Sequence, residues 1–80
     1  MSITVLSKPA CQPCVATYRA LNKAGLEYAS ADLSEDPDAL ALAHSLGHQQ
    51  SPVVVIRDDS GKIVDHWSGF RPDRLKALAA

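Results

Sequence analysis

Cys11 and Cys14 are the only cysteines of the 80-residue chain, and two residues separate them. A pair with this spacing can serve as a redox-active dithiol, as half of a metal site, or as a structural disulfide. The structural use is disfavoured, because closing a loop of about four residues contributes roughly 2 kcal/mol to stability. So tight a ring is also comparatively easy to reduce, which leaves the redox and metal uses as the stronger alternatives.

The metal alternative needs ligands beyond the two cysteines. His44 and His48 stand four residues apart and could nominally complete a Cys2His2 set. However, the 29 residues from 15 to 43 separate Cys14 from His44, whereas zinc fingers have about 12 to 15 there. We therefore expect two solvent-exposed histidines, a structural or exposed His66, and no metal site. Zinc or an iron–sulfur cluster is the remaining alternative of this class.

The redox alternative depends on the local structure around the cysteines. Residues 3–7 (ITVLS) predict a strand that Pro9 ends, and a helix is predicted over residues 12–24. Cys11 would then lie at the N-terminus of this helix, where unpaired N–H groups and the helix dipole favour a thiolate. Lys8 would add positive potential, unless it is simply a solvated surface lysine.

These positions predict a division of labour between the cysteines. The Cys11 thiolate attacks a substrate disulfide, and a mixed disulfide forms. Cys14, one turn into the helix and more shielded, then displaces the reduced substrate. Gln12 and Pro13 set the geometry of the ring that the two cysteines close. In a cytosolic chain, a C-x-x-C pair near a βαβ pattern is typical of thioredoxin-like redox motifs.

The dipeptide Ser51-Pro52 precedes an apolar run and has two interpretations. A proline at the first residue of a strand is common, because its missing N–H costs little there. Alternatively, the peptide bond is cis and faces Cys11, leaving backbone groups free to pair with the extended chain of a bound partner.

The segment WSGFRPD also has two interpretations. It reads as a strand-to-helix turn in which Trp67 and Phe70 are core aromatics. In the functional interpretation, the residues Ser68, Gly69, Phe70 and Arg71 lie at the end of the sheet near the cysteines. There they would shape the surface that meets a partner.

The periodicity of the chain predicts the elements that position these residues. Asp36 is the predicted N-cap of a helix that begins at Pro37 and ends at Gly47, and a final helix opens at Pro72. Strands are predicted over residues 3–7, 26–33, 52–57 and 62–67, with a turn at 58–61. The order β-α-β-α-β-β-α predicts an α/β fold, a four-stranded mixed sheet flanked by three helices, in one domain over residues 1–80.

Apolar residues of one strand and of all three helices are predicted to face the core. The apolar run 52–57 is typical of a strand covered on both faces. In the helices, the sets are Val15, Tyr18 and Leu21; Ala39, Leu42, Ala43 and Leu46; and Leu75 and Leu78.

Composition narrows the function classes. The formal net charge is −1 and no basic face is visible, which argues against a nucleic-acid binder. No apolar run approaches the roughly 20 residues that span a bilayer. The first residues lack the features of a signal peptide, so we expect a reducing cytoplasm as the compartment.

The blocks KPACQPC, SPVVV and WSGFRPDRLKAL, which span most of the chain in order, resemble the thioredoxin superfamily and within it the NrdH-type redoxins. The resemblance implies a glutaredoxin-like fold with Cys11 as the attacking cysteine, Cys14 as the resolving one and Pro52 as a cis-proline. Residues 68–71 would correspond to the turn that replaces a glutathione site. Gln12-Pro13 departs from the family's usual hydrophobic residue followed by Gln, and the proline before the second cysteine is more like thioredoxin.

What the resemblance implies about function is specific. The protein would be a monomeric dithiol electron donor to class Ib ribonucleotide reductase, with no bound cofactor beyond its Cys11–Cys14 disulfide. Thioredoxin reductase would reduce it, so NADPH would be used indirectly. The alternatives are a glutathione-dependent glutaredoxin, which usually has a Gly-Gly-Asp turn that is missing here, and the metal-binding module.

Overall fold

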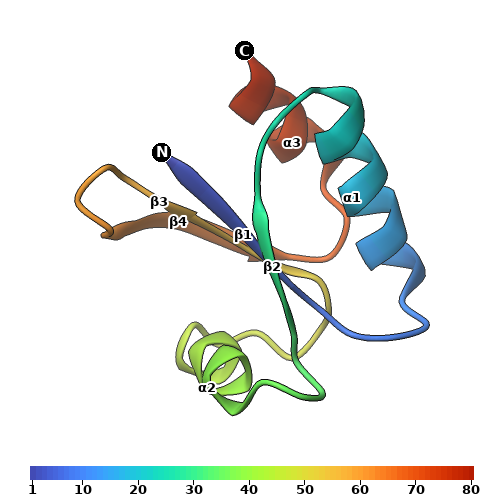
Figure 1. Ribbon diagram of the computed structural model, residues 1–80, viewed down its shortest axis with the longest axis vertical. Helices are drawn as coiled ribbons and strands as arrows, with labels where there is room; N and C mark the ends of the chain where they lie inside the picture. Colours follow the sequence, from blue (N-terminus) through green and yellow to red (C-terminus); the bar gives the residue numbers. More distant parts are fainter.

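The computed structural model of the protein describes residues 1–80 and contains a four-stranded sheet with helices on both faces (Figure 1). The sheet order is β2-β1-β3-β4; β1 and β2 run parallel, and the other two pairs are antiparallel. The predicted fold class and element order are therefore confirmed. The elements are β1 (Ser2–Ser7), α1 (Gln12–Lys23), β2 (Ala29–Asp32), α2 (Pro37–Ser45), β3 (Val53–Arg57), β4 (Ile63–Ser68) and α3 (Pro72–Ala79).

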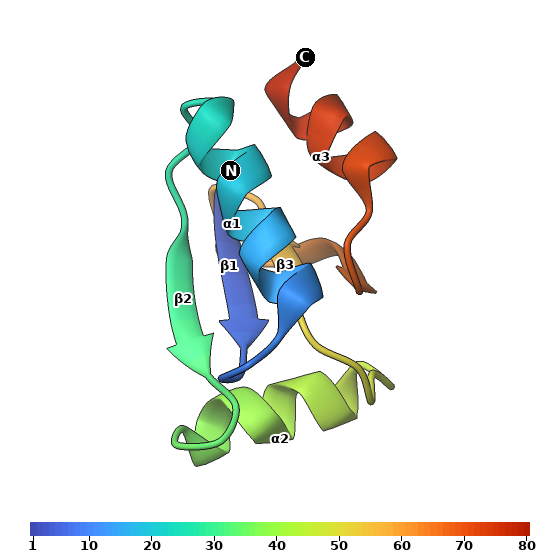
Figure 2. The ribbon, with the colours of Figure 1, turned by 90° about the vertical axis from the view of Figure 1, so that its right-hand side faces the viewer.

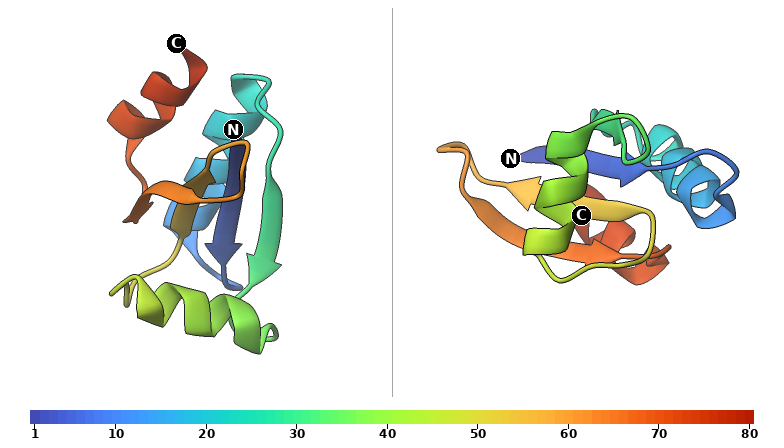
Figure 3. Two further views of the ribbon diagram at one scale, coloured as in Figure 1. Left: turned by 90° about the vertical axis from the view of Figure 1, so that its left-hand side faces the viewer. Right: turned by 90° about the horizontal axis from the view of Figure 1, so that it is seen from below.

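The helices are divided between the two faces of the sheet. Helices α1 and α3 lie together on one face, and α2 lies on the other (Figures 1 and 2). Figures 2 and 3 show that α2 runs across the strands rather than along them. None of the three helices combines the length and apolar character that crossing a membrane requires.

Strand β3 is covered on both faces, as its unbroken apolar sequence predicts. Val54 and Ile56 pack on the side of α1 and α3, and Val53 and Val55 pack on the side of α2. The alternation follows from the two-residue period of a strand. The first cluster contains Ile3, Val5, Leu21, Val54, Ile56, Trp67 and Leu75, and the second contains Leu6, Ala39, Ala43, Val53 and Val55.

Two glycines end α1 and α2 in the same way. Gly25 and Gly47 have φ of 71° and 81°, a left-handed conformation that other residues rarely adopt. After α1, the N–H of Leu26 bonds the carbonyl of Leu21 at 3.1 Å; after α2, the N–H of His48 bonds that of Ala43 at 3.0 Å. These contacts belong to Schellman motifs, which satisfy the last carbonyls of each helix.

The predicted start of β2 at residue 26 is wrong, because the strand begins at Ala29. The Schellman motif uses the N–H of Leu26 to close α1, so the chain needs a few residues to reach the sheet edge. On the way, Tyr28 stacks on Tyr18 with ring centroids 5.4 Å apart.

The predicted inner face of α1 is partly wrong. Val15 is 44% exposed, and the helix instead rests on the sheet through Cys14, Thr17 and Leu21. The buried Thr17 is tolerated there because its hydroxyl donates to the carbonyl of Pro13 at 2.9 Å. The faces predicted for α2 and α3 agree with the structure, since Ala39, Ala43 and Leu75 are buried and their predicted companions are partly buried.

Candidate active site

Cys11 and Cys14 form a disulfide at the N-terminus of α1. Cys11 is the N-cap residue, and the Cys14 N–H donates to its Sγ at 3.1 Å. This N–H is one of the groups that the first turn of a helix leaves without an intrahelical partner. Cys14 is the more shielded cysteine, with 2% of its surface exposed against 8% for Cys11. Of the two cysteines, Cys11 therefore lies nearer the surface and Cys14 lies behind it.

The residue before the disulfide has an unusual backbone. Ala10 has φ of 57°, in the left-handed region that costs a non-glycine residue on the order of 1 kcal/mol. Alanine gives no sequence signal for this conformation, and the sequence did not identify the position. The turn at Ala10 brings the chain from β1 into the helix that starts behind Cys11.

Residues predicted to contact a partner line one open cavity of about 480 Å³ beside the disulfide. Lys8, Gln12 and Pro13 lie on one side of this cavity with Cys11, and Ser51 comes from the loop on the opposite side. Gln49 and Gln50 also line this cavity and were not identified from the sequence, although they directly precede the predicted Ser51-Pro52 site.

The peptide bond between Ser51 and Pro52 is cis, and the Ser51 hydroxyl lies 3.3 Å from Cys11 Sγ. The Pro52 carbonyl accepts the N–H of Gly69 at 2.8 Å, so it is not free for a partner. In contrast, the N–H and C=O of Ser51 take no part in the backbone hydrogen bonds of the structure. Of the backbone groups predicted to be free, those of Ser51 remain available.

The 68–71 segment is joined to the site through this Gly69–Pro52 bond. Gly69 has φ of 83°, and the turn leads from β4 into α3. Phe70 is 40% exposed, so the expectation of two core aromatics holds only for Trp67. Arg71 is exposed and pairs with Asp73 at 3.5 Å. Neither Phe70 nor Arg71 lines the cavity beside the disulfide.

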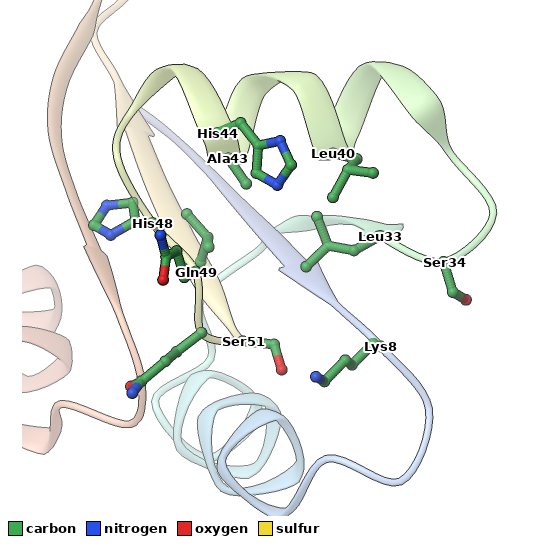
Figure 4. A pocket seen from close by; sticks show the side chains of 11 residues that line it. Lys8, Leu33, Ser34, Leu40, Ala43, His44, His48, Gln49 and Ser51 are labelled. Atoms are coloured by element: carbon green, nitrogen blue, oxygen red, sulfur yellow. The ribbon is translucent and has the colours of Figure 1, made fainter.

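A second cavity of about 220 Å³ adjoins the site on the side of α2 (Figure 4). Lys8 and Ser51 lie next to each other at one end of it, and Leu40 and His44 of α2 lie at the other. No Asp or Glu lines this cavity. The walls thus combine apolar surface with neutral and basic polar groups.

His48 and His66 contact each other, which corrects the expectation of a solvent-exposed His48. His48 Nε2 and His66 Nδ1 are 2.8 Å apart, and the Schellman motif fixes the backbone of His48. Burial lowers the pKa of His48, and the charge of His66 adds to this effect. No three His, Cys, Asp or Glu side chains come together as a metal site would require.

The chain matches known redox proteins over most of its length. The protein-family model described as Glutaredoxin matches residues 3–60. A "Glutaredoxin-like protein NrdH" of Salmonella typhimurium is 38% identical, with 98% of this chain and 89% of the relative covered. A "SPbeta prophage-derived thioredoxin-like protein YosR" of Bacillus subtilis is 27% identical, with 98% and 94% covered.

A solved structure extends the similarity to three dimensions. The NrdH-redoxin of Escherichia coli, described as a glutaredoxin-like protein with a thioredoxin-like activity profile, superposes with a TM-score of 0.83. It is 35% identical, with 98% of this chain and 95% of that chain covered.

Proposed function

The chain belongs to the glutaredoxin family, among the NrdH-type redoxins, and from this membership we propose that it donates electrons to a class Ib ribonucleotide reductase. The activity itself is that of a thiol–disulfide oxidoreductase whose redox centre is the Cys11–Cys14 pair. We further propose that thioredoxin reductase reduces the disulfide at the expense of NADPH. The protein would act in the cytoplasm as a monomer of one domain over residues 1–80.

The similarity to NrdH proteins over 98% of the chain is the observation that carries this proposal. The site is consistent with it. Cys11 is the more exposed cysteine, and Ser51 keeps a free N–H and C=O with which an extended partner segment could pair. The 68–71 turn, with an exposed Phe70 and the cationic Arg71, lacks the Gly-Gly turn followed by Asp that glutathione-dependent glutaredoxins usually have.

The choice of reductant is tested by NADPH consumption with the oxidised protein and a small disulfide substrate. One reaction contains thioredoxin reductase, and the other contains glutathione with glutathione reductase. We expect fast turnover only in the first, and the Cys11→Ser variant provides the blank for both. Fast turnover only with glutathione would overturn the proposal and identify a glutathione-dependent glutaredoxin.

A further inference from the structure

Two hydrogen-bond donors converge on the sulfur of Cys11. One is the N–H of Cys14 at 3.1 Å, and the other is the Ser51 hydroxyl at 3.3 Å. A disulfide sulfur carries no hydrogen, so the hydroxyl must be the donor in its contact with Cys11. None of the hydrogen bonds of the structure ends on Cys14 Sγ. The two sulfurs of the redox centre are therefore in unequal environments.

The Ser51 hydroxyl is held in place and committed to this one contact. Its oxygen has no other hydrogen-bond partner in the structure. The loop that carries it is anchored on both sides: the Pro52 carbonyl accepts the Gly69 N–H at 2.8 Å, and the His48 N–H bonds the Ala43 carbonyl at 3.0 Å. A donor fixed in this way needs little reorganisation when charge develops on the sulfur.

We propose that Ser51 is a catalytic residue whose hydroxyl donates a hydrogen bond to the Cys11 thiolate of the reduced protein. A hydrogen bond to a charged acceptor is worth more than one to a neutral acceptor, so the contact gains strength when Cys11 becomes a thiolate. This assignment rests on the thiol–disulfide exchange activity. It does not depend on which enzyme reduces the protein or on which protein it reduces.

The contact follows Cys11 through the reaction. The Cys11 thiolate attacks one sulfur of the partner disulfide; a new S–S bond forms, the partner's S–S bond breaks, and its other sulfur leaves as a thiolate. The Cys14 thiolate then attacks Cys11 Sγ, closes the intramolecular disulfide and releases the second partner sulfur. Two electrons pass to the partner, whose thiolates take up the two protons that the cysteines lost. Ser51 keeps its own proton throughout.

Removing the Ser51 hydroxyl should slow the attack by Cys11 at low pH and speed it at high pH. Without the donor, the thiolate forms at a higher pH, but each thiolate is a stronger nucleophile, with a Brønsted slope of about 0.4–0.5. For a midpoint that rises by roughly one pH unit, the attack becomes about threefold slower below both midpoints and about threefold faster above them. If the substitution only disturbed packing, the plots of rate against pH for the proteins with and without the hydroxyl would not cross.

The test measures the rate of alkylation of Cys11 by iodoacetamide between pH 4 and 10, with Cys14→Ser in every protein so that one thiol reacts. We expect the profile of Ser51→Ala to cross that of the parent, and Ser51→Thr, which keeps the hydroxyl, to restore the parent midpoint. Ser60→Ala, in the distant hairpin turn, is the matched control. Superimposable profiles, a uniform fall at every pH, or a Ser51→Thr profile that follows Ser51→Ala would each overturn the assignment.

A second measurement needs no substitution at Ser51. In the reduced natural sequence, the 13Cβ resonances of Ser51 and Cys11 should titrate with one shared midpoint. A Ser51 resonance that stays constant while Cys11 titrates would also overturn the assignment. Neither measurement contains a reductase or ribonucleotide reductase, so failure here is distinguishable from failure of the proposed function.

Discussion

We expect the stability of the protein to depend on pH through His48, which is partly buried and contacts His66. Burial, followed by the charge of His66, lowers the pKa of His48 below its usual 6.5. The unfolded chain therefore binds a proton more readily than the folded one, and stability is lost as the pH falls below about 6.5, towards the lowered pKa of the folded state. No carboxylate lines the cavity beside His48, so no negative charge there favours its protonated form.

We predict that the free energy of unfolding, measured in urea, falls between pH 7.5 and 5.5 and that His48→Gln reduces this fall. Glutamine keeps a polar side chain but does not titrate. The carboxyl groups with lowered pKa, such as Asp32 and Asp58, titrate below 3.8 and stay outside this window. Equal losses in the natural protein and in His48→Gln would contradict the prediction.

The unequal burial of the two cysteines predicts unequal phenotypes. Cys11→Ser removes the more exposed sulfur and should abolish turnover of a disulfide substrate. Cys14→Ser should still attack but cannot resolve, so it should accumulate mixed disulfides that mass spectrometry detects on Cys11. Trapping by Cys11→Ser instead of Cys14→Ser would reverse the assignment of roles.

Sequence reasoning predicted several of the residues that lie beside the disulfide, and it missed contacts that depend on strand register. The cysteine pair and Ser51 carry local signals, a C-x-x-C motif and a Ser-Pro step, and Lys8 was predicted from its position three residues before Cys11. The His48–His66 contact arises because β4 pairs with β3 so that His66 lies opposite Val55, on the face that α2 covers. No local pattern contains that information.

At the scale of elements, α2 depends on its N-cap. Asp36 accepts the N–H groups of Asp38 and Ala39 at 3.0 and 3.2 Å, and Pro37 occupies the first helical position. Since α2 is the one helix on its face of the sheet, loss of this cap should propagate to the second core cluster.

We predict that Asp36→Ala lowers the free energy of unfolding by about 1 kcal/mol, whereas Asp36→Asn, which keeps an accepting oxygen, loses much less. Equilibrium denaturation in urea, followed by circular dichroism, measures both. The cap would be unimportant if the two variants lost the same amount or neither lost any.

Helix boundaries were predicted well because caps, prolines and glycines act locally. Pro13, Asp36, Gly25 and Gly47 lie where the sequence placed them relative to α1 and α2. The start of β2 was predicted less well, because the Schellman motif after α1 uses residues that also have strand-like sequence. The inner face of α1 depends on how the helix sits on the sheet, which its own periodicity leaves open.

The whole molecule consists of one sheet with a small core on each face, so it has little stability to spare. Leu21 is fully buried between α1 and the sheet. Leu21→Ala should lower the free energy of unfolding by about 2–5 kcal/mol. Leu40→Ala, at a half-exposed position of α2, is the matched control and should change it by less than about 0.5 kcal/mol.

Urea denaturation followed by tryptophan fluorescence and by circular dichroism measures these losses with two probes. Because the two clusters share the strands of one sheet, we expect coincident transitions, as in a single cooperative domain. Separate transitions for the two probes would contradict the proposal that residues 1–80 fold as one domain.

A reconstituted electron-transfer chain tests directly whether this protein donates electrons to ribonucleotide reductase. It contains NADPH, thioredoxin reductase, this protein and a class Ib ribonucleotide reductase, and it measures the deoxyribonucleotide formed. We expect product formation that increases with the amount of this protein and disappears with Cys11→Ser. Product formation that is independent of the protein, or that appears only when glutathione and glutathione reductase replace thioredoxin reductase, would contradict it.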